Sequence, residues 1–461
     1  MTASPAPAGG ALARRLGLRD AVVIGLASMI GAGAFVSLGA AVELARWLAP
    51  LAVLIAAGVA LCNATSSAQL AAQHPSSGGT YHFGREQLGP WWGFLAGWCF
   101  VIGKTASCAA MALVIAAYLV PEGLQRPVAA LAVVVLTGVN LVGITRTAAL
   151  ARVLVTIALG ALVLTGVRLL VGLPGVEAEA GPADATLGGP AYSTPVLLWD
   201  RGLAGALDAW AGGPLGVALA VAQAAALMFF AFAGYARVAT LGEEVVEPRR
   251  TIPRAILLAL GIVTVLYLAL SVVLVQLLPA LSVGGWGPAP FLTALEIVGA
   301  GAPWRVIITV GAVAAAAGAL LALIAGISRT TLAMARERDL PPVLAHVDPA
   351  RSVPQRAELA AGIAIVLIVL LAPDVLTAIA ASSFGVLLYY AIANLSAFTQ
   401  RAPWRLYPKA MQVIGVVSCV LLVASLPGRT IAAGVALLAV GVAYRGVVLW
   451  RRRSREGAPN A

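Results

Sequence analysis

The sequence predicts an all-α integral membrane protein with about 12 transmembrane helices. Hydrophobic residues make up 61% of its 461 residues, and only 11% are charged. The apolar residues also fall in many runs of about twenty, the length that crosses the hydrocarbon core of a bilayer. Soluble domains are nearer half apolar, with about a quarter of their residues charged, so the composition excludes an ordinary globular enzyme.

The apolar runs place the transmembrane helices along the chain. Each run is long enough to cross, or nearly cross, a bilayer, and only a very short turn at 373–374 separates the ninth from the tenth. The predicted spans are residues 20–43, 48–72, 91–119, 127–144, 148–171, 215–240, 254–278, 304–334, 357–372, 374–399, 407–427 and 430–450.

Lysine and arginine between the spans predict the orientation. The formal net charge is +11, and most basic residues fall on one side if both termini are cytoplasmic, as the positive-inside rule expects. Residues 1–19 are then a disordered cytoplasmic tail, residues 172–214 an acidic extracellular loop, and residues 451–461 a basic cytoplasmic tail. The basic residues form no stripe with interleaved aromatics, so no nucleic-acid partner is predicted.

Two spans contain internal glycine-rich breaks. The first reads SMIGAGAF from Ser28 to Phe35, and the sixth reads FFAFAGY from Phe229 to Tyr235. Free backbone groups at membrane depth survive only where protein or a water-filled cavity receives them, and a zwitterionic amino acid suits such groups. Each glycine alone could instead serve close helix packing, but matched interruptions in two halves indicate an inverted-repeat transporter.

Two further motifs follow spans six and eight. They read EEVVEPRRTIPRAI from Glu243 and SRTTLAMARERDLP from Ser328. With the two glycine-rich breaks, they make the chain resemble the amino acid permeases of the amino acid–polyamine–organocation superfamily, from about Leu16 to the last span. The resemblance implies a five-plus-five inverted repeat, residues 20–171 and 215–399, followed by two extra helices in residues 400–450.

The resemblance also implies amino acid transport, coupled to protons or working by exchange, and a substrate site on helices one and six. The residues that it places at the substrate backbone are Ile30, Gly31, Ala32 and Gly33 on helix one, and Phe230, Ala231, Phe232, Ala233 and Gly234 on helix six.

Four charged or small residues depart from the family pattern. Ala236 and Arg237 stand where many members have an acidic and a small residue, and Ala158 stands where several proton-coupled members have a lysine. Span three instead carries Lys104 near its middle. A lysine at that depth is costly unless it is offset, so Lys104 is either a coupling or substrate-contacting residue or a structural tether. We expect its ammonium to reach the unwound part of helix one or Ser328.

Charged residues near the end of span six are candidates for a cytoplasmic gate or, as the alternative, for a solvated loop: Glu243, Glu244, Arg249 and Arg250. Exposed ion pairs contribute under about 1 kcal/mol each. Arg237 needs an anionic or carbonyl partner, either a substrate carboxylate or Glu243 or Glu244, because a cation at the start of a half-helix opposes its dipole.

The sequence therefore predicts a secondary active amino acid transporter of the inner or plasma membrane, working by alternating access, with no cofactor. No enzyme activity is expected, and no metal site, because the four cysteines lack the paired spacing of one. The alternatives are a polyamine or cationic amino acid antiporter and a non-transporting amino acid sensor. Partners are the substrate, protons and the bilayer, and the sequence leaves the oligomeric state open.

Overall fold

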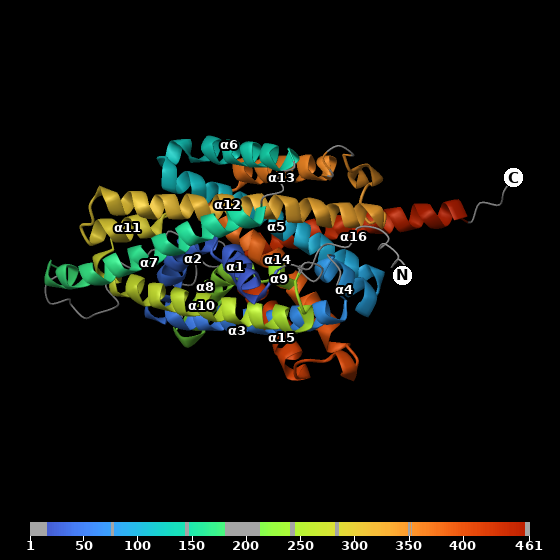
Figure 1. Cartoon of the computed structure of the whole chain (residues 1–461), viewed down its shortest axis with the longest axis horizontal. Helices are drawn as coiled ribbons and strands as arrows, with labels where there is room; N and C mark the ends of the chain where they lie inside the picture. The colour runs from blue at the N-terminus through green and yellow to red at the C-terminus, as the bar shows by residue number, and fades with distance from the viewer. Residues whose placement is uncertain are drawn as a thin grey trace, which may run out of the picture.

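The computed structural model describes residues 16–74, 78–142, 147–179, 213–239, 245–281, 285–348, 351 and 353–456. All the regular elements in these ranges are helices. Two isolated β-bridges join Leu16 to Val245 and Asp348 to Val353. In Figure 1 the long helices run roughly along the longest axis and pack side by side as a bundle.

The first half of the chain forms seven α-helices and one short 3-10 helix, η1 (Arg46–Leu48). The α-helices are α1 (Leu18–Met29), α2 (Ala32–Ala45), α3 (Ala49–Gln73), α4 (Gly79–Leu88), α5 (Pro90–Leu119), α6 (Glu122–Leu141) and α7 (Thr147–Glu179).

The second half repeats the long apolar helices and adds short ones between them. Its elements are α8 (Gly213–Phe232), α9 (Ala236–Ala239), α10 (Pro248–Gln276), η3 (Leu278–Ala280), α11 (Pro290–Ile297), α12 (Ala302–Arg336), η4 (Pro342–Ala345), α13 (Gln355–Leu371), α14 (Val375–Phe398), η5 (Ala402–Trp404), α15 (Lys409–Ser425) and α16 (Gly428–Glu456).

The helices have the length and composition of membrane-spanning segments. Nine helical segments in the described part of the chain are long and apolar enough to cross a bilayer, with α2 and α3 counted together because η1 joins them. The predicted all-helical, multi-span class is therefore confirmed. The number of twelve spans and the inverted repeat stay predictions.

Helices α5 and α14 occupy the centre of the bundle. Both are mostly buried and pack against each other, whereas α6 and α16 leave most of their apolar surface exposed. In Figure 1, α6 and α13 lie side by side along one edge, and α3 and α15 lie toward the opposite edge. A central α5 places Lys104 in the interior rather than against lipid.

Three predicted boundaries are corrected. Helix α1 begins at Leu18 and Leu16 pairs with Val245, so ordered structure starts before residue 20. Helix α7 continues to Glu179, which makes the first part of the predicted 172–214 loop helical; residues 180–212 lie outside the described part. Helix α16 continues to Glu456, since arginine and glutamate are good helix formers.

Candidate functional site

The first predicted break lies between α1 and α2. Helix α1 ends at Met29, and the Gly31 N–H turns back to the Met29 carbonyl at 2.9 Å. Helix α2 then begins at Ala32, so the break covers Ile30 and Gly31, and Ala32 and Gly33 are already helical. Gly31 has extended backbone angles and no side chain to cap α2, which leaves the first N–H groups of α2 as donors directed into the break.

The second predicted break lies between α8 and α9. Helix α8 ends at Phe232, and a turn follows over residues 233–235 before α9 begins. The Ala233 N–H still bonds to the Phe229 carbonyl at 3.0 Å, and the Arg237 N–H bonds to the Gly234 carbonyl at 3.0 Å. The interruption predicted within residues 229–235 is thus present over residues 233–235, and residues 229–232 are still helical.

The two breaks lie against each other. A Cβ on Gly234 would overlap the Ser28 carbonyl, and a Cβ on Gly33 would stand 2.6 Å from the Ala231 Cα. Glycine at these two positions lets the backbone of α8 and its following turn touch the backbone of the interrupted first helix. The sequence-predicted residues on helices one and six are therefore neighbours in space.

Two tyrosines that the sequence analysis did not select hold the carbonyls at the breaks. The Tyr267 hydroxyl on α10 donates to the Met29 carbonyl at 3.0 Å, and the Tyr390 hydroxyl on α14 donates to the Ala233 carbonyl at 3.1 Å. Both side chains are fully buried. The sequence could have indicated them, because a tyrosine inside an apolar span has a buried hydroxyl that needs a hydrogen-bond partner.

Lys104 points to the second break. It is 7% exposed, and its Nζ donates to the Ala233 carbonyl at 3.4 Å, the same oxygen that receives Tyr390. The expectation that it reaches helix one or Ser328 is wrong. The turn after α8 leaves the Ala233 carbonyl open to it, whereas the Ser328 hydroxyl donates to the Ala325 carbonyl at 3.0 Å and lies 3.4 Å from Glu358.

Of the four predicted gate residues, the structure describes Arg249 and Arg250. Arg249 stacks over the Trp404 ring at 4.6 Å, and Arg250 lies 4.0 Å from Glu247 in an exposed pair. Arg237 is half-buried on α9. Glu243 and Glu244, the expected carboxylate partners, lie outside the described residues.

A buried ionic cluster elsewhere was missed by the sequence analysis. Asp339, just after α12, accepts from the Tyr81 hydroxyl at 2.9 Å and from Arg85 at 2.9 Å. The Nη1 of Arg445, on α16, lies 2.7 Å from the other carboxylate oxygen of Asp339. This contact is an ion pair whose angles do not make it a hydrogen bond. Burial and then the nearby Asp339 carboxylate raise the pKa of the Tyr81 phenol, which keeps its proton for this bond. The cluster ties α4, α12 and α16 together.

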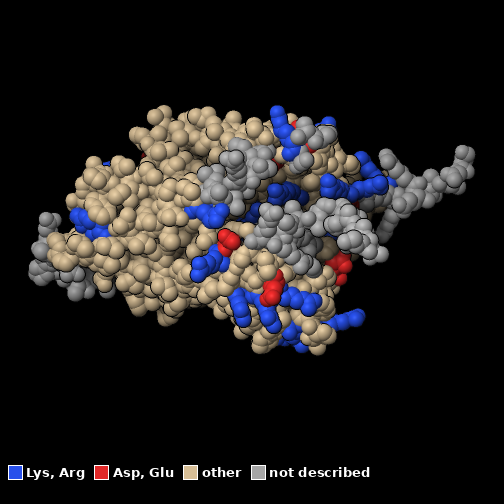
Figure 2. All heavy atoms as spheres, in the orientation of Figure 1, with Lys and Arg blue, Asp and Glu red and all other residues tan. Residues whose placement is uncertain are grey.

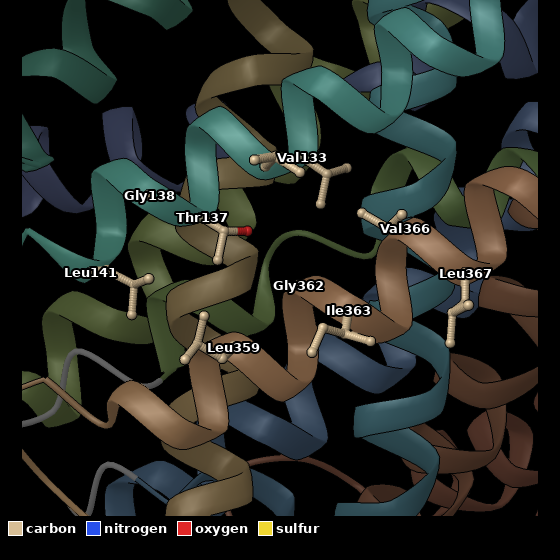
Figure 3. A pocket seen from close by; sticks show the side chains of 10 residues that line it. Val133, Thr137, Gly138, Leu141, Leu359, Gly362, Ile363, Val366 and Leu367 are labelled. Carbon is tan, nitrogen blue, oxygen red and sulfur yellow. The ribbon is translucent and has the colours of Figure 1, made fainter.

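An apolar groove of about 470 Å³ lies away from the two breaks. Figure 3 shows it between α6 and α13, with Thr137 next to Gly362. A Cβ on Gly362 would stand 3.0 Å from the Thr137 hydroxyl, so these helices touch there. Because both helices lie at the edge of the bundle, the groove belongs to the outer surface and not to the candidate site.

Metal-ligating side chains do not gather at the breaks in the part of the chain that the structure describes. Cys62, Cys99, Cys108 and Cys419 are buried and free. No group of three or more His, Cys, Asp or Glu that could hold a metal was found among the residues the structure describes. The groups that could recognise a ligand at the site are therefore backbone N–H and C=O groups, the two tyrosines and Lys104.

Comparison with known proteins identifies the kind of protein that this chain resembles. The family model described as amino acid permease matches residues 20–449. An uncharacterised transporter of Mycobacterium tuberculosis is 48% identical over 96% of this chain and 94% of its own length. A vacuolar cationic amino acid transporter of Arabidopsis thaliana is 30% identical over 76% of this chain and 57% of its own length.

A more distant relative and a solved structure are also similar to this chain. A serine/threonine exchanger of Bacillus subtilis is 26% identical over 85% of this chain and 84% of its own length. The solved structure of a Na⁺-coupled sialic acid symporter aligns with a TM-score of 0.54 over 90% of each chain, at 13% identity. That structural likeness concerns the arrangement of helices alone.

Proposed function

The chain belongs to the amino acid permease family, and on that premise we propose that it is a secondary active transporter of an amino acid, working by alternating access. The observation that carries the proposal is the contact between the two helix breaks, Ile30–Gly31 and Ala233–Tyr235. Interrupted helices at corresponding positions of two halves mark substrate sites in transporters with inverted repeats.

The breaks offer complementary groups to a zwitterion. The open N–H groups at the start of α2 suit a carboxylate, since a helix N-terminus attracts anions. The carbonyls at the end of α8, from Phe230 to Phe232, suit an ammonium. Both sets come from backbone atoms, so they recognise the common part of any amino acid and leave side-chain selectivity to the surrounding helices.

The charge of the site favours a neutral amino acid. Lys104 donates to Ala233 within the second break, and Arg237 lies on the helix that follows it. The Lys104 ammonium at the break opposes a cationic substrate. The 30% identity to a cationic amino acid transporter keeps cationic substrates as the second candidate, and they would need a carboxylate at the site.

We further propose that transport is coupled to protons and that Lys104 takes part. When protonated, its ammonium holds the Ala233 carbonyl and with it one conformation of the break. Loss of the proton releases that hold, so the conformational change depends on proton movement. An ionisable residue in the interior of a transmembrane bundle is a candidate for such a role.

We propose a cell-membrane location with both termini cytoplasmic. In Figure 2 the blue Lys and Arg atoms gather over the half of the visible face that carries α4 and the far end of α16, while the opposite end is mostly tan. A bias of this kind supports the cytoplasmic assignment of the α4 end.

The function is tested by uptake of labelled amino acids into proteoliposomes, with and without an inward proton gradient. We expect accumulation of at least one neutral amino acid, increased by the gradient. Competition with lysine and arginine separates neutral from cationic specificity. Absence of both uptake and exchange for all amino acids would overturn the proposal.

A Gly31→Leu change should abolish substrate binding while the protein still folds. A Cβ on Gly31 would stand 3.3 Å from the Ala319 Cβ and 3.6 Å from the Met111 Cε, the end of a flexible side chain, and would overlap no backbone atom of a neighbouring helix. A leucine there would fill the space beside the open N–H groups of α2. Substrate-induced thermal stabilisation of the purified protein measures the loss, and unchanged stabilisation would place the site elsewhere.

Gly33 and Gly234 are unsuitable for the same test. A side chain at either position would overlap backbone atoms of the facing helix, the Ala231 Cα at Gly33 and the Ser28 carbonyl at Gly234. We expect leucine at Gly234 to lower the yield of folded protein, as size-exclusion chromatography in detergent would show. This contrast separates a glycine that leaves room for substrate from glycines that allow the helices to touch.

A further inference from the structure

Glu358 is a buried carboxylate at the start of α13. It lies one turn into the helix and is 3% exposed. The Ser328 hydroxyl of α12 lies 3.4 Å from its Oε1, and its Oε2 has no hydrogen-bond partner in the described structure. A buried carboxylate with one oxygen unsatisfied is unusual, because buried polar groups are nearly always paired.

Asp339, the other buried carboxylate near this end of α12, has the close cationic partners that Glu358 lacks. Asp339 has two arginine side chains within 3 Å, Arg85 at 2.9 Å and Arg445 at 2.7 Å. Glu358 forms no comparable ion pair in the described ranges: Ser328 is its hydrogen-bond partner, and Arg329, the next residue of α12, acts on it through its charge without a hydrogen bond. A charged carboxylate that is buried with one oxygen unsatisfied and no cation in direct contact is costly, and binding a proton removes that cost.

The ionisable groups around this end of α13 come from three neighbouring elements. Helix α12 carries Arg329 and Arg336, α5 carries Lys104, and His346 follows η4. Helix α13 itself contributes the exposed Arg356. Helix α6 presents only the uncharged Thr137 and Asn140 on its neighbouring stretch. Of these groups, Arg329 acts on the Glu358 carboxylate through its charge, while the side chain in contact with it is the neutral Ser328.

Ser328 also lies at the membrane depth of Lys104. Helices α5 and α12 pack side by side in opposite directions, and the Met334 sulfur stands 2.7 Å from the place of a Cβ on Gly97. Lys104 is two helical turns beyond Gly97, a rise of about 10 Å, and Ser328 precedes Met334 by about 9 Å. The Ser328–Glu358 contact is therefore at nearly the same level as the buried lysine.

We propose that Glu358 binds and releases a proton during the transport cycle and that Ser328 positions its carboxylate. This inference rests on the proposed function and names a second residue for its coupling. The proton forms an O–H bond on Glu358 while the carboxyl group is buried. It leaves to water when the cytoplasmic end of α13 separates from α12, and the carboxylate is then solvated. Membrane-embedded carboxylates serve as proton carriers in other transporters.

The test compares Glu358→Gln with Glu296→Gln in proteoliposomes. Glutamine keeps the size of the side chain and cannot ionise. Glu296 is a matched control because it is exposed and lies 3.0 Å from Arg305. We expect Glu358→Gln to lose accumulation driven by the proton gradient and to retain exchange of labelled for unlabelled substrate, and the control to keep both.

Infrared difference spectroscopy of the purified protein gives a readout that does not depend on transport. A carboxyl band that appears as the pH is lowered should be present in the wild type and in Glu296→Gln, be absent from Glu358→Gln, and shift in Ser328→Ala. Normal gradient-driven accumulation by Glu358→Gln would overturn the inference, and so would a wild type that is indifferent to the gradient. If the wild type neither accumulates nor exchanges any amino acid, the proposed function itself fails.

Discussion

Replacing Asp339 with alanine should lower the free energy of unfolding by about 3–5 kcal/mol, the usual effect of removing one partner from a buried ion pair. Asp339 is 6% exposed and Arg445 is 4% exposed. Without the carboxylate, Arg445 would remain buried against the Trp91 and Phe94 rings with its charge uncompensated. The Tyr81 hydroxyl would lose its acceptor as well.

Thermal unfolding of the detergent-purified variant measures this effect. The matched control is Glu296→Ala, which removes an exposed carboxylate 3.0 Å from Arg305 and should change stability by under about 1 kcal/mol. Equal melting temperatures for both variants would mean that water solvates Arg445 once the carboxylate is gone. We also expect loosened attachment of α16, detectable as faster proteolysis near its end.

The class of fold was predictable because it depends on composition. Long apolar runs form helices in a bilayer whatever their neighbours, since every backbone polar group must be satisfied within the segment. The glycines also marked both breaks, because glycine lowers helix stability and lets another backbone approach closely. Within the first break, however, Gly31 is the cap of α2 and Gly33 is already helical. Helix boundaries at this level depend on single hydrogen bonds, which periodicity does not specify.

The partners of individual side chains were not predictable. Lys104 bonds to Ala233, 129 residues away in sequence, and Asp339 joins Arg85 and Arg445 from opposite ends of the chain. Such contacts depend on how α5, α12 and α16 pack and on how each helix is turned about its own axis, which hydropathy does not specify. The motif after span eight contains Asp339, but only the structure shows that its carboxylate is buried among two arginines.

Replacing Lys104 with methionine should abolish amino acid accumulation driven by a proton gradient, while exchange survives. Methionine keeps much of the length of the side chain and removes the charge. The wild-type ammonium holds the Ala233 carbonyl at the second break, so its loss uncouples the break from protonation. Uptake and exchange in proteoliposomes, each measured across a range of external pH, give the two readouts.

Tyr390→Phe is the matched control for this prediction, because the Tyr390 hydroxyl donates to the same Ala233 carbonyl and carries no charge. If Lys104 only tethers the break, both variants lose one hydrogen bond to one oxygen and should behave alike. If Lys104 couples transport to protons, Tyr390→Phe keeps gradient-driven uptake with its normal pH dependence and Lys104→Met does not. Normal accumulation against a gradient by Lys104→Met would assign the lysine a structural role and leave coupling to another buried group, such as Glu358, whose Oε2 has no hydrogen-bond partner in the described structure.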